Sequence, residues 1–349
     1  MRHLARLGAD AAVFLSVNTA FAHHPGGAGN VGDAGPINTI SATTLEQGQT
    51  VAGVVVDYSS LKTLSDARLT AAAAAGATGV HGLRSIQATS LSAAYGVTSD
   101  LTLGLRLPVV RRTGIRAAED DGSGAIDVLD HGSSTGLGDL TILGQYRFVN
   151  DRAVRFEAAL LAGLTVPTGA TGRRSRQGDL LDLEFQPGSG SWNGLLGLAL
   201  TKRAGQWSFD SNVLYVRAGD GTQNTNLGDQ VLANAAVSYR LTGFAASAAG
   251  PMYHGAIPHD HVEPQVSSKT GPKLDLVLEL NGEWHGKQTT AGVTDANSGG
   301  TTVYLAPGVR LSQDRWSAFV SVGVPVIRDS NGIQPEPEWR VRSGLGVAF

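Results

Sequence analysis

The chain has 349 residues, of which 46 are glycine and none is cysteine, and its formal net charge is −3. Without cysteine it can form neither disulfides nor a thiolate metal site, and this net charge gives no reason to expect nucleic-acid binding. Only 16% of the residues are charged, against roughly 25% in soluble domains, and glycine is well above its usual share of about 7%. This composition favours extended, turn-rich structure over a helical bundle.

Residues 1–22 are predicted to be a secretory signal peptide. Arg2 and Arg6 precede an apolar stretch over 11–22, which ends in the cleavage pattern Ala20-Phe21-Ala22. A first amphipathic helix is the alternative, but the HHPGGAGN that follows continues a helix poorly. After this stretch no apolar run approaches the ~18 residues that a transmembrane helix needs. We therefore expect export to a Gram-negative cell envelope, with residues 23–50 forming a Gly/His-rich periplasmic segment.

From residue 51 to the end, the dominant signal is a period of two. In the segment LDLVLELN (274–281) one face is all leucine, and the other carries Asp275 and Glu279. Because side chains alternate along a strand, this segment has one apolar and one polar surface. Similar segments predict eleven further strands at about 51–58, 84–95, 99–108, 138–148, 152–166, 190–202, 206–217, 229–240, 301–312, 315–325 and 339–349.

The connections between these segments alternate in length. Those at 98–100, 150–151, 204–205 and 313–314 are short, whereas those at the other end are mostly longer and richer in glycine. This alternation is typical of a transmembrane barrel with short periplasmic turns and longer outer loops. We therefore predict an all-β fold, an antiparallel up-and-down β-barrel of about 12 strands over 51–349, with a periplasmic insertion at 241–271. A soluble β-sandwich is the alternative.

Three smaller features agree with a barrel. All five tryptophans fall near predicted strand ends, where they would form girdles at the two membrane interfaces: Trp192, Trp207, Trp284, Trp316 and Trp339. Pro108, Pro167 and Pro325 stand where three strands are expected to end, because proline cannot donate to the ladder. The alanine-rich stretch 65–76 predicts a short helix inside the first outer loop.

The last strand ends the chain on Phe349. A terminal aromatic on the apolar face resembles the signal by which the outer-membrane assembly machinery recognises its substrates. The segments YGVTSDLTLGLRLPVV (95–110), GLGDLTILGQYRF (136–148) and LDLVLELNGEWHG (274–286) are similar to the barrel family of phenol-degradation meta-pathway outer-membrane transporters. The resemblance implies a cell outer membrane location, with membrane lipid and lipopolysaccharide as partners. It transfers no binding residues.

The polar face of a barrel strand points into the lumen. A twelve-stranded barrel lies between side-chain-filled small barrels and open porins, so we expect a narrow channel or one occluded by an inserted loop. Two interpretations stay open for the charges inside: a transverse field that orients polar solutes, or a salt-bridge network that fills the lumen. The candidate lumen-lining residues are Arg106, Arg147, Arg155, Asp275, Glu279, Glu283, Arg310, Arg340 and Arg342.

One motif suggests catalysis. Residues 132–136 match the G-x-S-x-G pattern of serine hydrolases, and His131 stands next to them. That pattern requires a strand-to-helix turn, whereas this stretch runs from a loop into a strand. We therefore predict that the protein is not an enzyme, and keep a barrel hydrolase using Ser133 or Ser134 as an alternative.

Five histidines map to the periplasmic side of the predicted topology. Neutral imidazole suits Cu(II) and Zn, and a free N-terminal histidine offers both its amine and its ring to one ion. The alternative is that two Gly/Pro-rich segments simply contain histidines without a ligand role. The candidate metal ligands are His23, His24, His254, His259 and His261; apart from this candidate Cu or Zn site we expect no cofactor.

The function that follows is an outer-membrane channel or transporter for the passive passage of small solutes. The resemblance suggests aromatic or hydrophobic compounds as the solute class. A metal-binding accessory outer-membrane protein is the alternative, and the five histidines would distinguish it.

Overall fold

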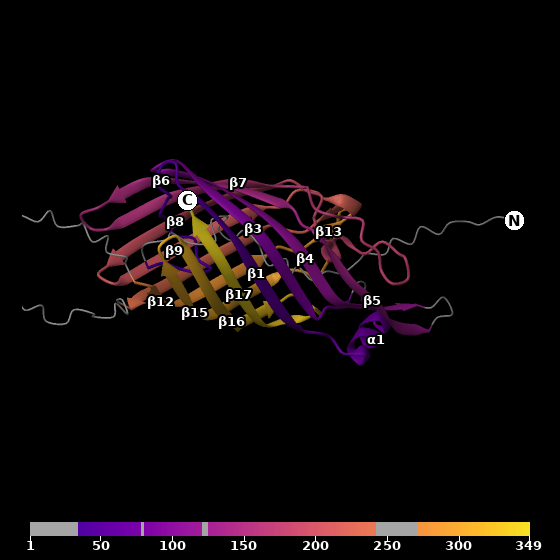
Figure 1. Cartoon of the computed structure of the whole chain (residues 1–349). Coiled ribbons are helices and arrows are strands. Elements are labelled where there is room, and N and C mark those ends of the chain that lie inside the picture. The colour runs from indigo at the N-terminus through magenta and orange to yellow at the C-terminus, as the bar shows by residue number, and fades with distance from the viewer. Residues whose placement is uncertain (1–33, 78–79, 121–124, 242–270) are drawn as a thin grey trace, which may run out of the picture.

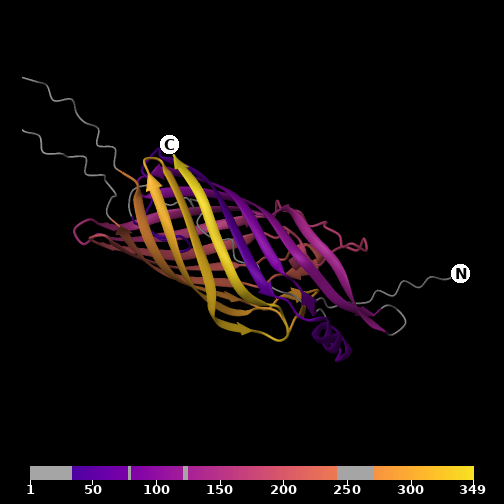
Figure 2. The ribbon, with the colours of Figure 1, turned by 60° about the horizontal axis from the view of Figure 1, so that its bottom comes forward.

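A computed structural model describes residues 34–77, 80–120, 125–241 and 271–349. Twelve strands form the barrel wall, and each pairs antiparallel with the next wall strand along the chain, so that β4 pairs with β6. The first wall strand, β1, also pairs with the last, β17. The sheet therefore closes on itself, as Figure 2 shows where the last strand lies against the first. The predicted twelve-stranded barrel is confirmed. The strands are β1 (Thr50–Lys62), β3 (Ser85–Thr98), β4 (Leu101–Asp120), β6 (Leu140–Asp151), β7 (Phe156–Val166), β8 (Asn193–Ala204), β9 (Trp207–Arg217), β11 (Gln230–Leu241), β12 (Lys273–His285), β15 (Gly300–Gln313), β16 (Trp316–Ser330) and β17 (Glu336–Ala348).

The smaller elements gather at one end of the barrel. Figure 1 shows α1, β5 and β13 at the end opposite the C-terminus. Ser65 caps α1 by accepting a hydrogen bond from the Arg68 amide, as the alanine-rich stretch predicted. None of the helices in the described ranges is long and apolar enough to cross a membrane. The smaller elements are α1 (Asp66–Ala74), β2 (His81–Gly82), β5 (Ile126–Leu137), η1 (Leu183–Phe185), η2 (Thr222–Asn224), β10 (Thr225–Asn226), β13 (Thr289–Thr290) and β14 (Val293–Thr294).

Strand parity separates the two faces of the barrel wall. On β12 the side chains of Leu276, Leu278 and Leu280 are exposed, whereas Asp275 and Glu279 are buried. A soluble sandwich would bury its leucines and expose its carboxylates, so this arrangement is that of a barrel with lipid outside and polar groups inside. The five tryptophans also lie exposed on the outer surface.

Two of the three proline predictions are corrected, because β4 and β16 continue past Pro108 and Pro325. Residues 101–106 of β4 pair with β6, and from Val109 onward the strand pairs with β5 instead. Pro108 lies at this switch, where its carbonyl accepts the Gly138 amide and no N–H of its own is needed. The strand therefore runs on to Asp120 rather than ending at the proline. Likewise β16 continues past Pro325 to Ser330, next to a bulge opposite Val303 and Tyr304.

Candidate functional site: the barrel lumen

Residues 36–45, here called the plug segment, lie inside the barrel rather than in the periplasm. They precede β1 in the chain and are separated from it by residues 46–49. This corrects part of the prediction that 23–50 is a periplasmic segment; residues 23–33 lie outside the described residues, as do the predicted signal peptide and most of the 241–271 insertion. The correction has a physical reason: the segment is uncharged from residue 34 to residue 45, and the inward wall offers it hydrogen-bond partners.

Glu279 of β12 is the main anchor of the plug segment. Its carboxylate accepts the backbone amides of Ile37 at 3.1 Å, Asn38 at 2.9 Å and Thr39 at 2.9 Å. The Asn38 side-chain amide also donates to it, and Arg310 donates to the carbonyl of Pro36. Glu279 is only 1% exposed. A buried carboxylate is stable when such donors surround it, so Glu279 depends on the plug as much as the plug depends on Glu279.

Side chains from four other strands satisfy the rest of the plug backbone. The amides of Ile40, Ala42 and Leu45 each donate over 2.8 Å, to Asn212 of β9, Thr201 of β8 and Thr102 of β4 respectively. Gln145 of β6 donates to the carbonyls of Ser41 and Thr43. The segment thus forms no strand, yet six of its backbone amides and three of its carbonyls are hydrogen-bonded to side chains of the wall.

Apolar contacts complete the seat of the plug. Ile40 and Ala42 belong to one cluster of buried side chains with inward-facing residues of β6, β7, β8, β9 and β11: Leu143, Ala159, Leu161, Leu195, Ala199, Leu214, Val216 and Leu232. Ile37 packs in a second cluster with Val55, Val277 and Phe319. The plug segment therefore fills this part of the lumen, where its polar groups meet polar side chains of the wall and its apolar side chains meet apolar ones.

Most of the predicted lumen charges are buried and ion-paired. Arg106 of β4 lies 2.9 Å from Asp57 of β1, and Arg342 of β17 lies 3.3 Å from the same carboxylate. Arg340 pairs with Glu283. Asp275 accepts two hydrogen bonds from Arg240, at 2.7 and 2.9 Å. Asp57 and Arg240, the partners of these charges, were not among the predicted lumen-lining residues, although both stand at inward positions of their strands.

Arg147 and Arg155 lie at the end of the barrel where the chain terminates. Arg147 reaches Glu157 at 2.6 Å and Asp100 at 2.9 Å, beside the plug. Arg155 does not line the lumen: it lies exposed in the turn between β6 and β7, with a φ of 52°. The Asp151 carboxylate accepts the amides of the next turn residues, Ala153 and Val154, and so ends the strand before Arg155.

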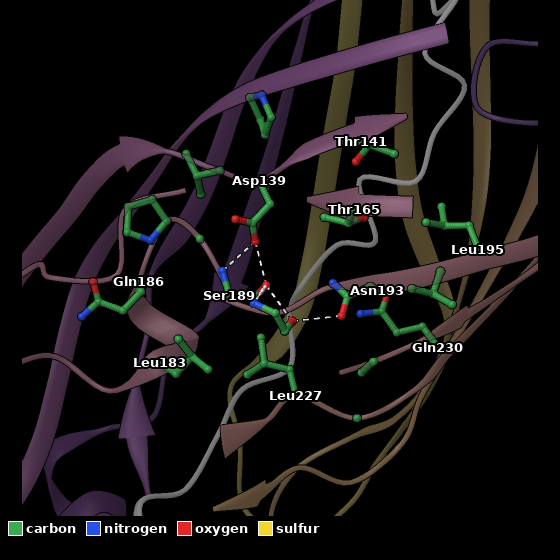
Figure 3. A pocket seen from close by; sticks show the side chains of 18 of the residues that line it. Asp139, Thr141, Thr165, Leu183, Gln186, Ser189, Asn193, Leu195, Leu227 and Gln230 are labelled. Carbon is green, nitrogen blue, oxygen red and sulfur yellow. Dashed lines mark hydrogen bonds between the residues drawn. The ribbon is translucent and has the colours of Figure 1, made fainter. Parts of the chain in front are cut away.

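A cavity of about 120 Å³ lies above the plug (Figure 3). Its wall comes from β4, β6, β7, β8, β9 and β11, and the loop over 183–191 folds inward to cover it. Asp139 holds this loop: its carboxylate accepts the amide and the hydroxyl of Ser189, both at 2.7 Å. Apolar, uncharged polar and charged side chains line it: Val110, Leu183, Leu195, Val216, Leu227, Thr141, Thr165, Asn193, Gln230, Arg106, Arg112 and Asp139.

The serine-hydrolase motif does not form a nucleophile elbow. Ser133 and Ser134 lie within β5, which is a continuous strand from Ile126 to Leu137. His131 lies 2.9 Å from Glu119 of the paired strand β4. The residues of the motif are therefore part of a hairpin that extends the barrel wall, and no strand-to-helix turn presents a serine. The five candidate metal-binding histidines lie outside the described residues.

The chain is similar to several solved structures. An outer-membrane channel from Pseudomonas putida F1 matches with a TM-score of 0.56 at 17% identity, over 88% of this chain and 98% of that chain. The P. putida toluene transporter TodX matches with a TM-score of 0.42 at 9% identity, over 91% and 99% of the two chains. The CymD monoaromatic hydrocarbon channel gives 0.40 at 10% identity, over 93% and 96%. No curated protein matches the sequence.

The closed barrel, its lipid-facing leucines and its polar, plugged lumen define an outer-membrane β-barrel protein. The model of the family described as "putative MetA-pathway of phenol degradation" matches residues 75–274, more than half of the sequence. The chain belongs to this family, and the resemblance noted in its strand segments is confirmed.

Proposed function

We propose that the protein is an outer-membrane channel for the passive passage of small solutes, in which the plug segment acts as the gate. The observation that carries the proposal is the cavity above the plug. Leu195 and Val216 line this cavity and also pack around Ile40 of the plug. A solute in the cavity would therefore contact wall residues that also hold the plug segment in its seat.

The solute class that fits this cavity is a small aromatic or hydrophobic compound with one polar group. An apolar protein cavity of about 150 Å³ accommodates benzene, so a space of about 120 Å³ suits a single ring. Thr141, Asn193 and Gln230 supply hydroxyl and amide groups between the apolar side chains. The description of the family, which names phenol degradation, supports the same class.

The proposed function involves no covalent chemistry. Passage requires only that the plug leave its seat and return, which is an equilibrium between two conformations of one segment. Hydrogen bonds to a charged group contribute about 1.5–3 kcal/mol each, so the closed form is favoured and opening is infrequent.

Single-channel recording in planar lipid bilayers tests the proposal. We expect rare openings from the mature protein and a persistent conductance from a variant lacking residues 36–45. Uptake of phenol into proteoliposomes should rise in the same variant. If the variant folds, as shown by heat-modifiable migration on gels, and neither conducts nor admits phenol, the channel function is refuted.

A further inference from the structure

Three side chains with metal-binding chemistry meet in the outer loops, away from the plug. His81 lies on β2, and Asp182 and Glu184 lie at the short helix η1. His81 Nε2 lies 3.8 Å from an oxygen of Asp182, and His81 Nδ1 lies 3.9 Å from an oxygen of Glu184. One ligand atom from each residue lies within 4.8 Å of the other two. We call these three residues the loop cluster.

Glu184 is the unusual member of the loop cluster. It is 2% exposed, and neither of its carboxylate oxygens has a hydrogen-bond partner. Buried carboxylates in proteins are normally paired and hydrogen-bonded. One oxygen of this buried carboxylate faces the His81 imidazole and the Asp182 carboxylate.

The charges around Glu184 leave a negative excess. Asp182 and Asp295 act on Glu184 as further negative charges, and the buried guanidinium of Arg112 is the positive charge acting on it. Arg112 donates to the carbonyl of Gln186 at 2.8 Å, at the far end of the same loop turn. A divalent cation bound between Asp182 and Glu184 would supply positive charge beside these two carboxylates.

We propose that the loop cluster binds a divalent transition-metal ion of the zinc class, with His81, Asp182 and Glu184 as ligands. An imidazole with two carboxylates is a donor set that suits zinc better than calcium or magnesium, which prefer oxygen alone. One ring nitrogen of His81 and one oxygen of each carboxylate lie within 4.8 Å of one another, and side-chain rotations would bring them to the spacing of about 3.4 Å between ligand atoms of tetrahedral zinc. Asp182 is about one-third exposed, which leaves a path from solvent and room for water as a fourth ligand.

The ion would join two loops that are far apart in sequence. The His81 ring already packs edge-on against Phe185, with centroids 5.1 Å apart, so the two loops are aligned before the ion binds. In the sequence, Leu183 stands between Asp182 and Glu184, and its side chain lines the cavity above the plug. A bound ion would therefore fix part of the cavity wall as well as the outer loops.

Zinc binding to the mature protein in detergent tests the proposal. The background is a variant in which His23, His24, His254, His259 and His261 are all asparagine, so that these histidines cannot contribute. After equilibrium dialysis against zinc chloride, we expect one bound ion per chain in this background. Adding Glu184→Gln, or separately His81→Asn, should abolish it. The matched control is Glu119→Gln, which removes the carboxylate beside His131 in the β4–β5 hairpin and should leave zinc binding unchanged.

Thermal unfolding supplies a second readout. Without zinc, the Glu184→Gln variant should be no less stable than its background, because the substitution removes a buried carboxylate that lacks donors. Zinc should raise the midpoint of the background and leave that of Glu184→Gln unchanged. A background that binds no zinc, or a Glu184→Gln variant that binds it equally well, would overturn the assignment.

Discussion

Glu279 shows at the scale of one residue how the lumen differs from a passive polar lining. The alternating pattern of β12 places its carboxylate inward, and the structure agrees. Its partners are not the arginines of neighbouring strands but three consecutive amides that lie about 240 residues earlier in the chain. Inward orientation could be predicted from parity, whereas these partners could not, because the plug has no periodic pattern that places it.

Replacing Glu279 by glutamine should open the channel. Glutamine has nearly the same shape but is neutral and presents one oxygen in place of two, so the three plug amides lose a charged acceptor. At about 1.5–3 kcal/mol for a hydrogen bond to a charged group, we expect the open fraction in planar bilayers to rise at least tenfold, which corresponds to about 1.4 kcal/mol.

The matched control is Asp275→Asn, on the same strand. It removes the Asp275–Arg240 ion pair, which touches the wall and not the plug. We expect a lower unfolding midpoint with no change in open fraction. Equal conductance changes in the two variants would show that Glu279 does not hold the plug in particular.

Leu195 and Leu196 offer a test of the cavity within two adjacent residues of β8. Leu195 is buried and lines the cavity, whereas Leu196 is exposed on the lipid face. An indole at 195 should fill most of a space of about 120 Å³, so Leu195→Trp should lower phenol uptake into proteoliposomes severalfold. Leu196→Trp should leave uptake unchanged. Unaltered uptake in Leu195→Trp would place the solute route elsewhere.

At the scale of elements, the strands could be predicted and the plug segment could not. Alternation located all twelve strands, because lipid and lumen impose opposite polarity on successive residues. It underestimated the outer ends of two strands, since β4 continues to Asp120 and β16 to Ser330. The plug segment forms neither helix nor strand, and its one sequence signal is an uncharged run beside the first strand.

The base of the plug depends on Gly96 of β3. Its amide donates to Gln49, its carbonyl accepts the amide of Gly48, and a Cβ at this position would overlap the carbonyl of Glu46. Gly96→Ala should therefore displace the turn at 46–49 and raise the channel's open fraction. Gly194→Ala on β8 is the control, since a Cβ there meets no atom within 4 Å. Identical single-channel records from both variants would contradict this role.

At the scale of the whole molecule, the lipid bilayer acts as the solvent that fixes the orientation of every strand. Leu278 lies exposed near the middle of β12 and Val293 lies exposed in an outer loop. Arginine on the lipid face near the bilayer midplane costs about 2–4 kcal/mol, so Leu278→Arg should lower the free energy of unfolding from lipid vesicles by this amount. Val293→Arg should change it little. Urea titration in vesicles measures both, and equal values would mean that β12 does not face lipid.

The pairing of β1 with β17 has a consequence for the order in which the protein can assemble. A turn over residues 46–49 connects the plug segment to β1 at Thr50, and β1 forms the seam with the last strand of the chain. Once Val51 to Lys62 have paired with residues 336–348, the wall has no lateral gap through which the plug could enter. The segment must therefore be in place before the final strand is added, or it must thread through an end of the finished cylinder. Unless the plug segment threads through an end, closure of the β1–β17 seam thus depends on that segment having entered the lumen first.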